Sequence, residues 1–211
     1  LKDLGINPYP AEAQKDLSHK EIIENFSDYE GKEAVLAGRI MSWREHGALV
    51  FADLQDFTDR IQLFIKEDTL EETNIDKQLL GFENIGLLDV GDFIQVKGEI
   101  TKTKRGEISL VVEELKLLAK SLRPLPEKHE GLKDKETRMR RRYLDTTVNK
   151  EVRDRFVRRS KFWKAHRDFF DEKGFLEMNI PVLELVPGGG DANPFVTHME
   201  AIDQEFFLRI S

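Results

Sequence analysis

The strongest constraint on the fold is a run of five apolar segments with alternating polarity between residues 34 and 117. Successive side chains of a β-strand point to opposite faces, so this alternation predicts strands with one buried face. The clearest segment has Ile61, Leu63 and Ile65 on one face and Gln62 and Phe64 on the other. One face can build a core while the other presents an aromatic ring and an amide.

The order of these segments predicts a small closed barrel. Strands are expected at 34–44, 49–54, 60–65, 92–100 and 107–117, and segment 68–88, which lacks alternation, is expected to form a helix with a loop. Gly38 lies in the middle of the first strand, where a glycine often marks a bend or bulge. Three strands, a helix and a two-stranded hairpin are the order of an oligonucleotide-binding (OB) barrel.

The chain of 211 residues exceeds one such barrel and favours two domains. Residues 1–33 are expected to form an N-terminal extension, with a helix at 18–29 that packs on the barrel. Ser18, followed three residues later by Glu21, has the spacing of a capping box. The barrel domain itself is expected to occupy 34–120.

The second part of the chain has a different pattern. Two prolines in 123–126 indicate a stiff connector, so a linker is expected at 121–137. Residues 138–211 are expected to begin an α+β domain, with a long amphipathic helix followed by strands at 175–180 and 205–210. The apolar pattern continues to the last residue, so we expect this domain to be truncated.

Charge and composition limit the function. Residues 1–120 hold 15 Lys and Arg against 24 Asp and Glu, so bulk positive charge does not explain any binding of nucleic acid by the barrel. There is no cysteine, which excludes disulfides and thiolate chemistry. No apolar run reaches the roughly 20 residues that span a bilayer. We therefore expect a cytoplasmic protein that makes no membrane contact.

The outward positions of the barrel gather groups that suit a nucleic acid. Bases of a single strand stack on aromatic rings and are read by hydrogen bonds to their edges. Alternation places both kinds of group on one face: Arg39, Trp43, Phe51, Gln62, Phe64 and Glu107, with Arg44 at the strand end. The alternative is that these rings pack beneath the N-terminal segment.

Three other patterns are weaker indications of a functional site. The basic residues of helix 150–173 alternate with acids, which is typical of a solvated helix face. The glycines at 188–190 lack the Walker and dinucleotide-binding spacings, so spacing alone favours a loop there. The histidines show no paired spacing, and we predict no metal site.

A set of short motifs in a fixed order gives the chain a family likeness. They span nearly the whole chain: Gly5-Ile6-Asn7-Pro8-Tyr9-Pro10, Phe51-x-x-Leu54-Gln55-Asp56, Thr103-Lys104-x-Gly106-Glu107, Leu122-Arg123-Pro124-Leu125-Pro126, Arg142-Tyr143-Leu144-Asp145, Pro187-Gly188-Gly189, Pro194-Phe195-x-Thr197-His198 and Phe207-Leu208-Arg209-Ile210. In this order they resemble class II lysyl-tRNA synthetase. The segment from Gly174 to Pro181 resembles that family's first class-defining motif.

The resemblance implies roles for individual residues in binding the anticodon loop of tRNA(Lys). Phe51 would stack on the central uridine, and Gln62 and Glu107 would read the edge of that base. Phe64 and Arg44 would make neighbouring stacking and phosphate contacts. These implied roles fall on the face that alternation identifies.

The resemblance also implies a reaction for the parent enzyme. Lysine and ATP would form lysyl-adenylate with Mg²⁺, and the lysyl group would pass to the tRNA. Gly189 would contact the lysine substrate, while Phe175 and Pro181 would lie at a homodimer interface. The later class motifs lie outside the sequence, so we expect this polypeptide alone to be inactive and assign it no catalytic residue.

Some positions depart from the family pattern, and two other functions stay open. Gly190, Asp191, Asn193 and Met199 differ from the residues usual in the lysine-pocket loop. A free-standing single-strand-binding barrel is one alternative. An aspartyl or asparaginyl synthetase is the other, since these share the barrel layout.

Overall fold

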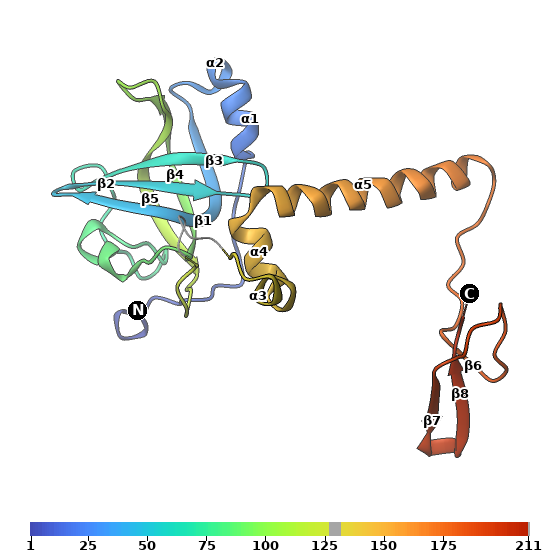
Figure 1. The fold of residues 1–211 in the computed structure, drawn as a ribbon. Helices are drawn as coiled ribbons and strands as arrows, with labels where there is room; N and C mark the ends of the chain where they lie inside the picture. Colours follow the sequence, from blue (N-terminus) through green and yellow to red (C-terminus); the bar gives the residue numbers. More distant parts are fainter. Residues whose placement is uncertain (127–131, 211) are drawn as a thin grey trace. The chain divides into compact units, whose positions relative to one another are not determined.

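The computed structural model describes residues 1–126 and 132–210. Residues 127–131, which fall in the predicted linker, and residue 211 lie outside the described part. The chain divides into two compact units, Leu1–Leu144 and Asp145–Ser211 (Figure 1). No helix in the described part is both long and apolar enough to cross a membrane.

The first unit is built on a closed five-stranded barrel, as the alternation predicted. Its strands are β1 (Glu33–His46), β2 (Leu49–Gln55), β3 (Arg60–Lys66), β4 (Phe93–Lys102) and β5 (Ile108–Ala119). They close in the order β1-β2-β3-β5-β4. The β3–β5 pair is parallel and the other pairs are antiparallel. This is the five-stranded OB fold expected from the order of the segments.

The barrel core consists of the inward positions of every strand. Side chains buried there include Leu36, Ile40, Leu54, Leu63, Ile65, Ile94, Ile100 and Leu110. Each fully buried side chain of this size stabilises the fold by about 1.5–3 kcal/mol relative to exposure. The apolar positions of the alternating pattern are therefore the buried positions of the barrel, and the polar positions face outward.

A bulge in β1 changes which residues point outward. The pairing of β1 with β2 shifts register between Ile40 and Ser42, so one extra residue enters β1. An extra residue reverses the alternation beyond it. Trp43 consequently lies opposite the buried Ala52 and packs against the core. The prediction that Trp43 belongs to the outer face was wrong.

Two glycines allow strands to approach closely. A Cβ on Gly38 would lie 2.6 Å from the carbonyl oxygen of Gln55. A Cβ on Gly98 would lie 1.8 Å from the carbonyl oxygen of Val111. Real Cβ atoms do not approach oxygen so closely, so these positions exclude larger residues. Gly38 thus marks close strand contact, whereas the bulge of β1 lies a few residues beyond it.

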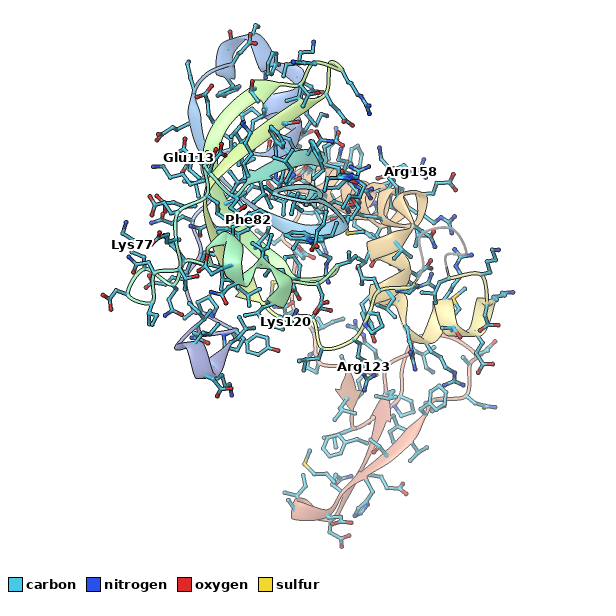
Figure 2. The ribbon with its side chains drawn as sticks, turned by 90° about the vertical axis from the view of Figure 1, so that its left-hand side faces the viewer. Lys77, Phe82, Glu113, Lys120, Arg123 and Arg158 are labelled. Carbon is cyan, nitrogen blue, oxygen red and sulfur yellow. The ribbon has the colours of Figure 1, made fainter. Side chains whose placement is uncertain are left out.

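The helix predicted within 68–88 is confirmed only as the 3-10 helix η2 (Phe82–Leu87). The preceding residues turn back on themselves through a bridge between Asn74 and Leu79. Polar side chains hold this loop locally: the Thr73 hydroxyl donates to Glu83, and the Gly81 amide donates to Thr73 at 2.9 Å. Phe82, on η2, is labelled in Figure 2.

The N-terminal segment packs on the barrel. It contains the 3-10 helix η1 (Lys2–Leu4), α1 (His19–Glu24) and α2 (Phe26–Tyr29), the last two drawn in blue in Figure 1. The Ser18 hydroxyl accepts a hydrogen bond from the Glu21 amide at 3.2 Å, which confirms the predicted cap. Ile22 is fully buried in the barrel core cluster.

Three helices follow in the chain, and the first of them begins within the predicted linker 121–137. They are α3 (Lys135–Arg140), α4 (Arg142–Val148) and the long α5 (Lys150–Glu172), which matches the predicted long helix. α5 ends before Gly174, whose φ of 80° is the left-handed conformation that glycine adopts readily.

A small sheet of order β6-β8-β7 is formed by β6 (Leu183–Glu184), β7 (Val196–Met199) and β8 (Gln204–Leu208), with the 3-10 helix η3 (Glu200–Ile202) between β7 and β8. The strand predicted at 205–210 corresponds to β8. The strand predicted at 175–180 was wrong, because within the described residues no strand pairs with that segment. Apolar alternation makes a strand only where a partner completes the hydrogen bonds.

Candidate nucleic-acid interface

Two aromatic rings form the centre of the outer barrel face. Phe51 on β2 and Phe64 on β3 are direct cross-strand partners. Their rings stack with centroids 4.9 Å apart and an angle of 10° between planes. Both rings are partly exposed, so they present apolar surface beside the groove described below. His46 meets the edge of Phe51, with centroids 6.3 Å apart.

A polar chain lies beside the rings. Gln62 donates a hydrogen bond from Nε2 to Oε2 of Glu107 at 2.8 Å, and its Oε1 accepts one from the Ser109 hydroxyl at 2.9 Å. Gln62 is 8% exposed and Ser109 is fully buried, whereas Glu107 is exposed at the rim. The parallel pairing of β3 with β5 places Gln62 directly beside Ser109.

The bulge in β1 brings a basic side chain to this face. Beyond the bulge Arg44 pairs with Phe51 across the strands, so both point outward. Arg44 Nη2 lies 3.7 Å from Oδ1 of Asp53, and its side chain remains half exposed. A cation at this position can reach a phosphate while the rings hold a base.

These groups line a groove of about 790 Å³. The end of β4 and the hairpin turn before β5 contribute part of the lining, which includes several cations: Arg44, Lys66, Lys102, Lys104 and Arg105. Lys66 Nζ also lies 4.9 Å from the centroid of the Phe64 ring. The first 120 residues are acidic as a whole, so this local cluster is where an anionic strand is best accommodated.

The structure brings together Arg44, Phe51, Gln62, Phe64 and Glu107, but it does not bring Arg39 to the groove. Arg39 precedes the bulge, and its Nη1 donates to the Gly91 carbonyl at 3.0 Å. Its guanidinium lies 4.1 Å from the centroid of Phe93, and burial lowers its pKa. Arg39 points outward, as alternation predicts, but it pairs with Gln55 at the other end of β2 from Phe51 and therefore lies outside the groove.

Some lining residues escaped sequence reasoning. His46, Lys66 and Lys102 lie at strand ends, where alternation is hard to follow, and Lys104 and Arg105 come from a turn with no strand pattern. The available signal was that this turn is basic and ends on Gly106. The Ser109 contact with Gln62 depends on the parallel pairing of β3 with β5, which the sequence does not reveal.

The remaining predicted site residues lie in the second unit. Gly189 and Gly190 follow one another with φ values of 92° and 108°, between β6 and β7. Phe175 meets Phe170 edge to face, with ring centroids 5.3 Å apart. Phe175 and Pro181 are both exposed.

The groups that line the groove suit the binding of bases. Within the described residues there is no cluster of three or more His, Asp or Glu side chains that could hold a metal ion. The rings offer π faces, the Gln62 amide offers a donor, and the Glu107 carboxylate offers an acceptor. Stacking with edge hydrogen bonds is how single-stranded bases are recognised.

Comparison with known proteins identifies both parts of the chain. Residues 34–118 match the OB-fold nucleic acid binding domain, and residues 134–211 match tRNA synthetases class II (D, K and N). The chain is therefore a class II tRNA synthetase sequence that joins a nucleic-acid-binding barrel to the beginning of a catalytic region.

Within that class, the chain belongs to the lysyl-tRNA synthetase family. It is 44% identical over 211 residues to the lysine–tRNA ligase of Syntrophomonas wolfei, covering all of this chain and 41% of that protein. It is 45% identical over 212 residues to the lysine–tRNA ligase of Thermoanaerobacter pseudethanolicus, with the same coverage. The chain thus spans about two-fifths of the length of the curated relatives it matches.

Proposed function

We propose that this chain provides anticodon recognition for an enzyme that attaches lysine to tRNA(Lys). The observation that carries the proposal is the stacked pair Phe51 and Phe64 beside the polar pair Gln62 and Glu107 on one groove. The lysine–tRNA ligase relatives support the identity of the tRNA.

In this proposal the central uridine of the anticodon stacks on Phe51. Gln62 donates to a carbonyl oxygen of the uracil, while Glu107 accepts from its N3–H group. Phe64 supports the neighbouring base, and Arg44 contacts a phosphate. Arg39, which lies outside the groove, is not assigned a role in this binding.

The whole enzyme would form lysyl-adenylate from lysine and ATP and transfer the lysyl group to tRNA. ATP and Mg²⁺ would supply the activated phosphate chemistry, but the described residues contain no ligand cluster for the metal. Gly189 is exposed, and because glycine has no side chain a ligand can approach its backbone closely, which supports the proposed lysine contact.

The proposed arrangement has an extension at 1–33, a barrel domain at 34–120, a linker at 121–137 and a catalytic beginning at 138–211. We also propose a homodimer that uses Phe175 and Pro181. The support for the homodimer is a series of exposed apolar side chains after Gly174, including Leu176 at 84% and Met178 at 72% exposure. The cytoplasmic location stays a prediction.

The test is binding of an RNA stem-loop whose loop carries three uridines. Phe51→Ala should weaken binding by about 1–3 kcal/mol, the usual contribution of one ring stacked on a base. Phe57→Ala is the matched control, because Phe57 is 70% exposed in the β2–β3 turn and does not line the groove. Unchanged affinity of Phe51→Ala would contradict the assignment. Equal affinity for oligocytidine would instead favour a general single-strand-binding barrel.

A further inference from the structure

The buried hydroxyl of Ser109 has a defined partner but no role in the binding described above. Its Oγ lies 2.9 Å from Gln62 Oε1, while its other acceptor, the Glu107 carbonyl, is more distant at 3.4 Å. Ser109 is fully buried, so it does not itself reach the groove. It can influence a bound base only through Gln62.

We propose that Ser109 fixes the orientation of the Gln62 amide, with Nε2 facing the groove, and thereby makes the groove prefer uridine over cytidine. The inference rests on the proposed function and deepens it. By donating to Oε1, the Ser109 hydroxyl holds the amide oxygen inside the barrel wall and turns Nε2 toward the groove. The two Nε2 hydrogens then serve Glu107 and one further acceptor.

The chemistry of the two bases makes this orientation decisive. Uracil presents a carbonyl acceptor at C4 and a donor at N3, which match an amide donor and a carboxylate acceptor. Cytosine presents an amino donor at C4 and an acceptor at N3, so donor meets donor and acceptor meets acceptor. A rotated Gln62 amide would offer its oxygen to the cytosine amino group and would remove part of the discrimination.

Glu107 and Ser109 contact opposite ends of the Gln62 amide. In the absence of a base, the Glu107 carboxylate favours the same orientation of the amide, because a carboxylate can only accept hydrogen bonds and Nε2 is the donor end of Gln62. When uracil is bound, that carboxylate accepts from the N3–H group as well as from Nε2, so it is shared between two donors. The Ser109 hydroxyl donates to the Oε1 end, and that hydrogen bond is lost when the amide rotates. Ser109 is therefore a positioning residue for base specificity.

The experiment compares two RNA stem-loops that share one stem and differ only at the central loop base, uridine or cytidine. Their affinities for the 211-residue chain are measured by fluorescence anisotropy. The unaltered chain should prefer uridine by roughly tenfold to a hundredfold, the range that paired edge hydrogen bonds provide. Ser109→Ala should reduce this preference by roughly three- to tenfold, with a smaller decrease in affinity for the uridine loop.

Two further variants separate positioning from packing. Ser109→Cys keeps nearly the same volume but replaces the hydroxyl with a weak donor, so it should also lose preference. Ser42→Ala is the matched control, since the Ser42 hydroxyl is buried in β1 and has no partner among the described residues. This control should retain the full preference.

Each result is decisive. Loss of preference in both Ser109 variants with retention in Ser42→Ala supports the inference. Preserved preference in Ser109→Ala and Ser109→Cys overturns it and leaves the proposed function intact. If the unaltered chain shows no preference for uridine, the proposed function fails first and the inference falls with it.

Discussion

Gln62 Nε2 donates to Glu107 Oε2 across 2.8 Å, joining β3 to the end of the hairpin turn before β5. The turn itself is fixed by Thr103, whose hydroxyl accepts from the Glu107 amide at 3.1 Å and whose amide donates to the Glu107 carbonyl at 2.9 Å. A donor and an acceptor separated by 45 residues are thus held side by side at one groove. A donor and an acceptor placed next to each other can distinguish bases by the hydrogen-bonding groups on the base edge.

The first prediction concerns the acceptor of this pair. Glu107→Ala should weaken binding of the uridine stem-loop by about 1.5–3 kcal/mol, because the variant removes a hydrogen bond to a charged group. The measurement is a direct binding titration. Glu113→Ala removes the same charge from β5 outside the groove lining and serves as control (Glu113 is labelled in Figure 2). Equal decreases in affinity in both variants would show that only net charge matters.

The second prediction concerns the cations of the hairpin turn. Replacing Lys104 and Arg105 together by alanine should make the salt dependence of RNA binding shallower. The log–log slope should fall by about 0.7 for each phosphate of a single strand that the variant no longer neutralises. Lys77→Ala, which removes a cation away from this groove, should leave the slope unchanged (Lys77 is labelled in Figure 2). An unaltered slope in the double variant would place the phosphates elsewhere.

The third prediction concerns strand packing. Gly98→Ala should destabilise the barrel by roughly 1–3 kcal/mol or more, because the new Cβ must displace the Val111 backbone. Chemical denaturation measures the change in the free energy of unfolding. Gly86→Ala adds the same methyl group where nothing lies within 4 Å and should stay within about 0.5 kcal/mol of the unaltered chain. Equal stability of both variants would contradict the close approach.

The fourth prediction concerns the buried His19, which joins the N-terminal segment to the β2–β3 turn. Its Nδ1 lies 3.2 Å from the Asp59 carbonyl and 3.7 Å from Asp56 Oδ1, while Nε2 has no partner among the described residues. Burial lowers the pKa of His19, an effect that Lys15 reinforces and that Asp56 and Asp59 partly oppose. The folded state therefore favours the neutral ring.

The sign of the pH dependence follows from this lowered pKa. As pH falls below about 6.5, the unfolded chain takes up the proton first, so the free energy of unfolding decreases. His19→Leu should flatten this dependence between about pH 7 and pH 5. His166→Ala, a change at an exposed position of α5, should preserve it. A persistent slope in His19→Leu would assign the effect to another group.

Asp56 contributes in a separate range. Burial alone would raise its pKa, but hydrogen bonds from Lys15, Thr58 and the backbone hold that pKa well below its usual range. The stability it provides is present above the unfolded pKa of about 4 and is lost only as pH falls through the lower folded value. Its contribution is thus constant across the range in which His19 titrates.

The sequence by itself was sufficient for the local features of this protein. Alternation identified all five strands, and it placed Phe51, Gln62 and Phe64 on one outer face because strand parity depends only on neighbouring residues. The Ser18 cap and the long helix α5 were equally local. The ordered motifs then indicated the family that the comparisons confirm.

Only the tertiary structure decided which of these residues meet. The bulge of β1 arises from its pairing with β2, and it turned Trp43 inward and brought Arg44 beside Phe51. Arg39 precedes the bulge and lies opposite Gln55, away from the groove. The parallel pairing of β3 with β5 placed Ser109 against Gln62. A one-residue shift in strand register moves the following side chains to the opposite face of the sheet, and the local sequence pattern does not show it. Register and long-range pairing are therefore decided only when the barrel closes.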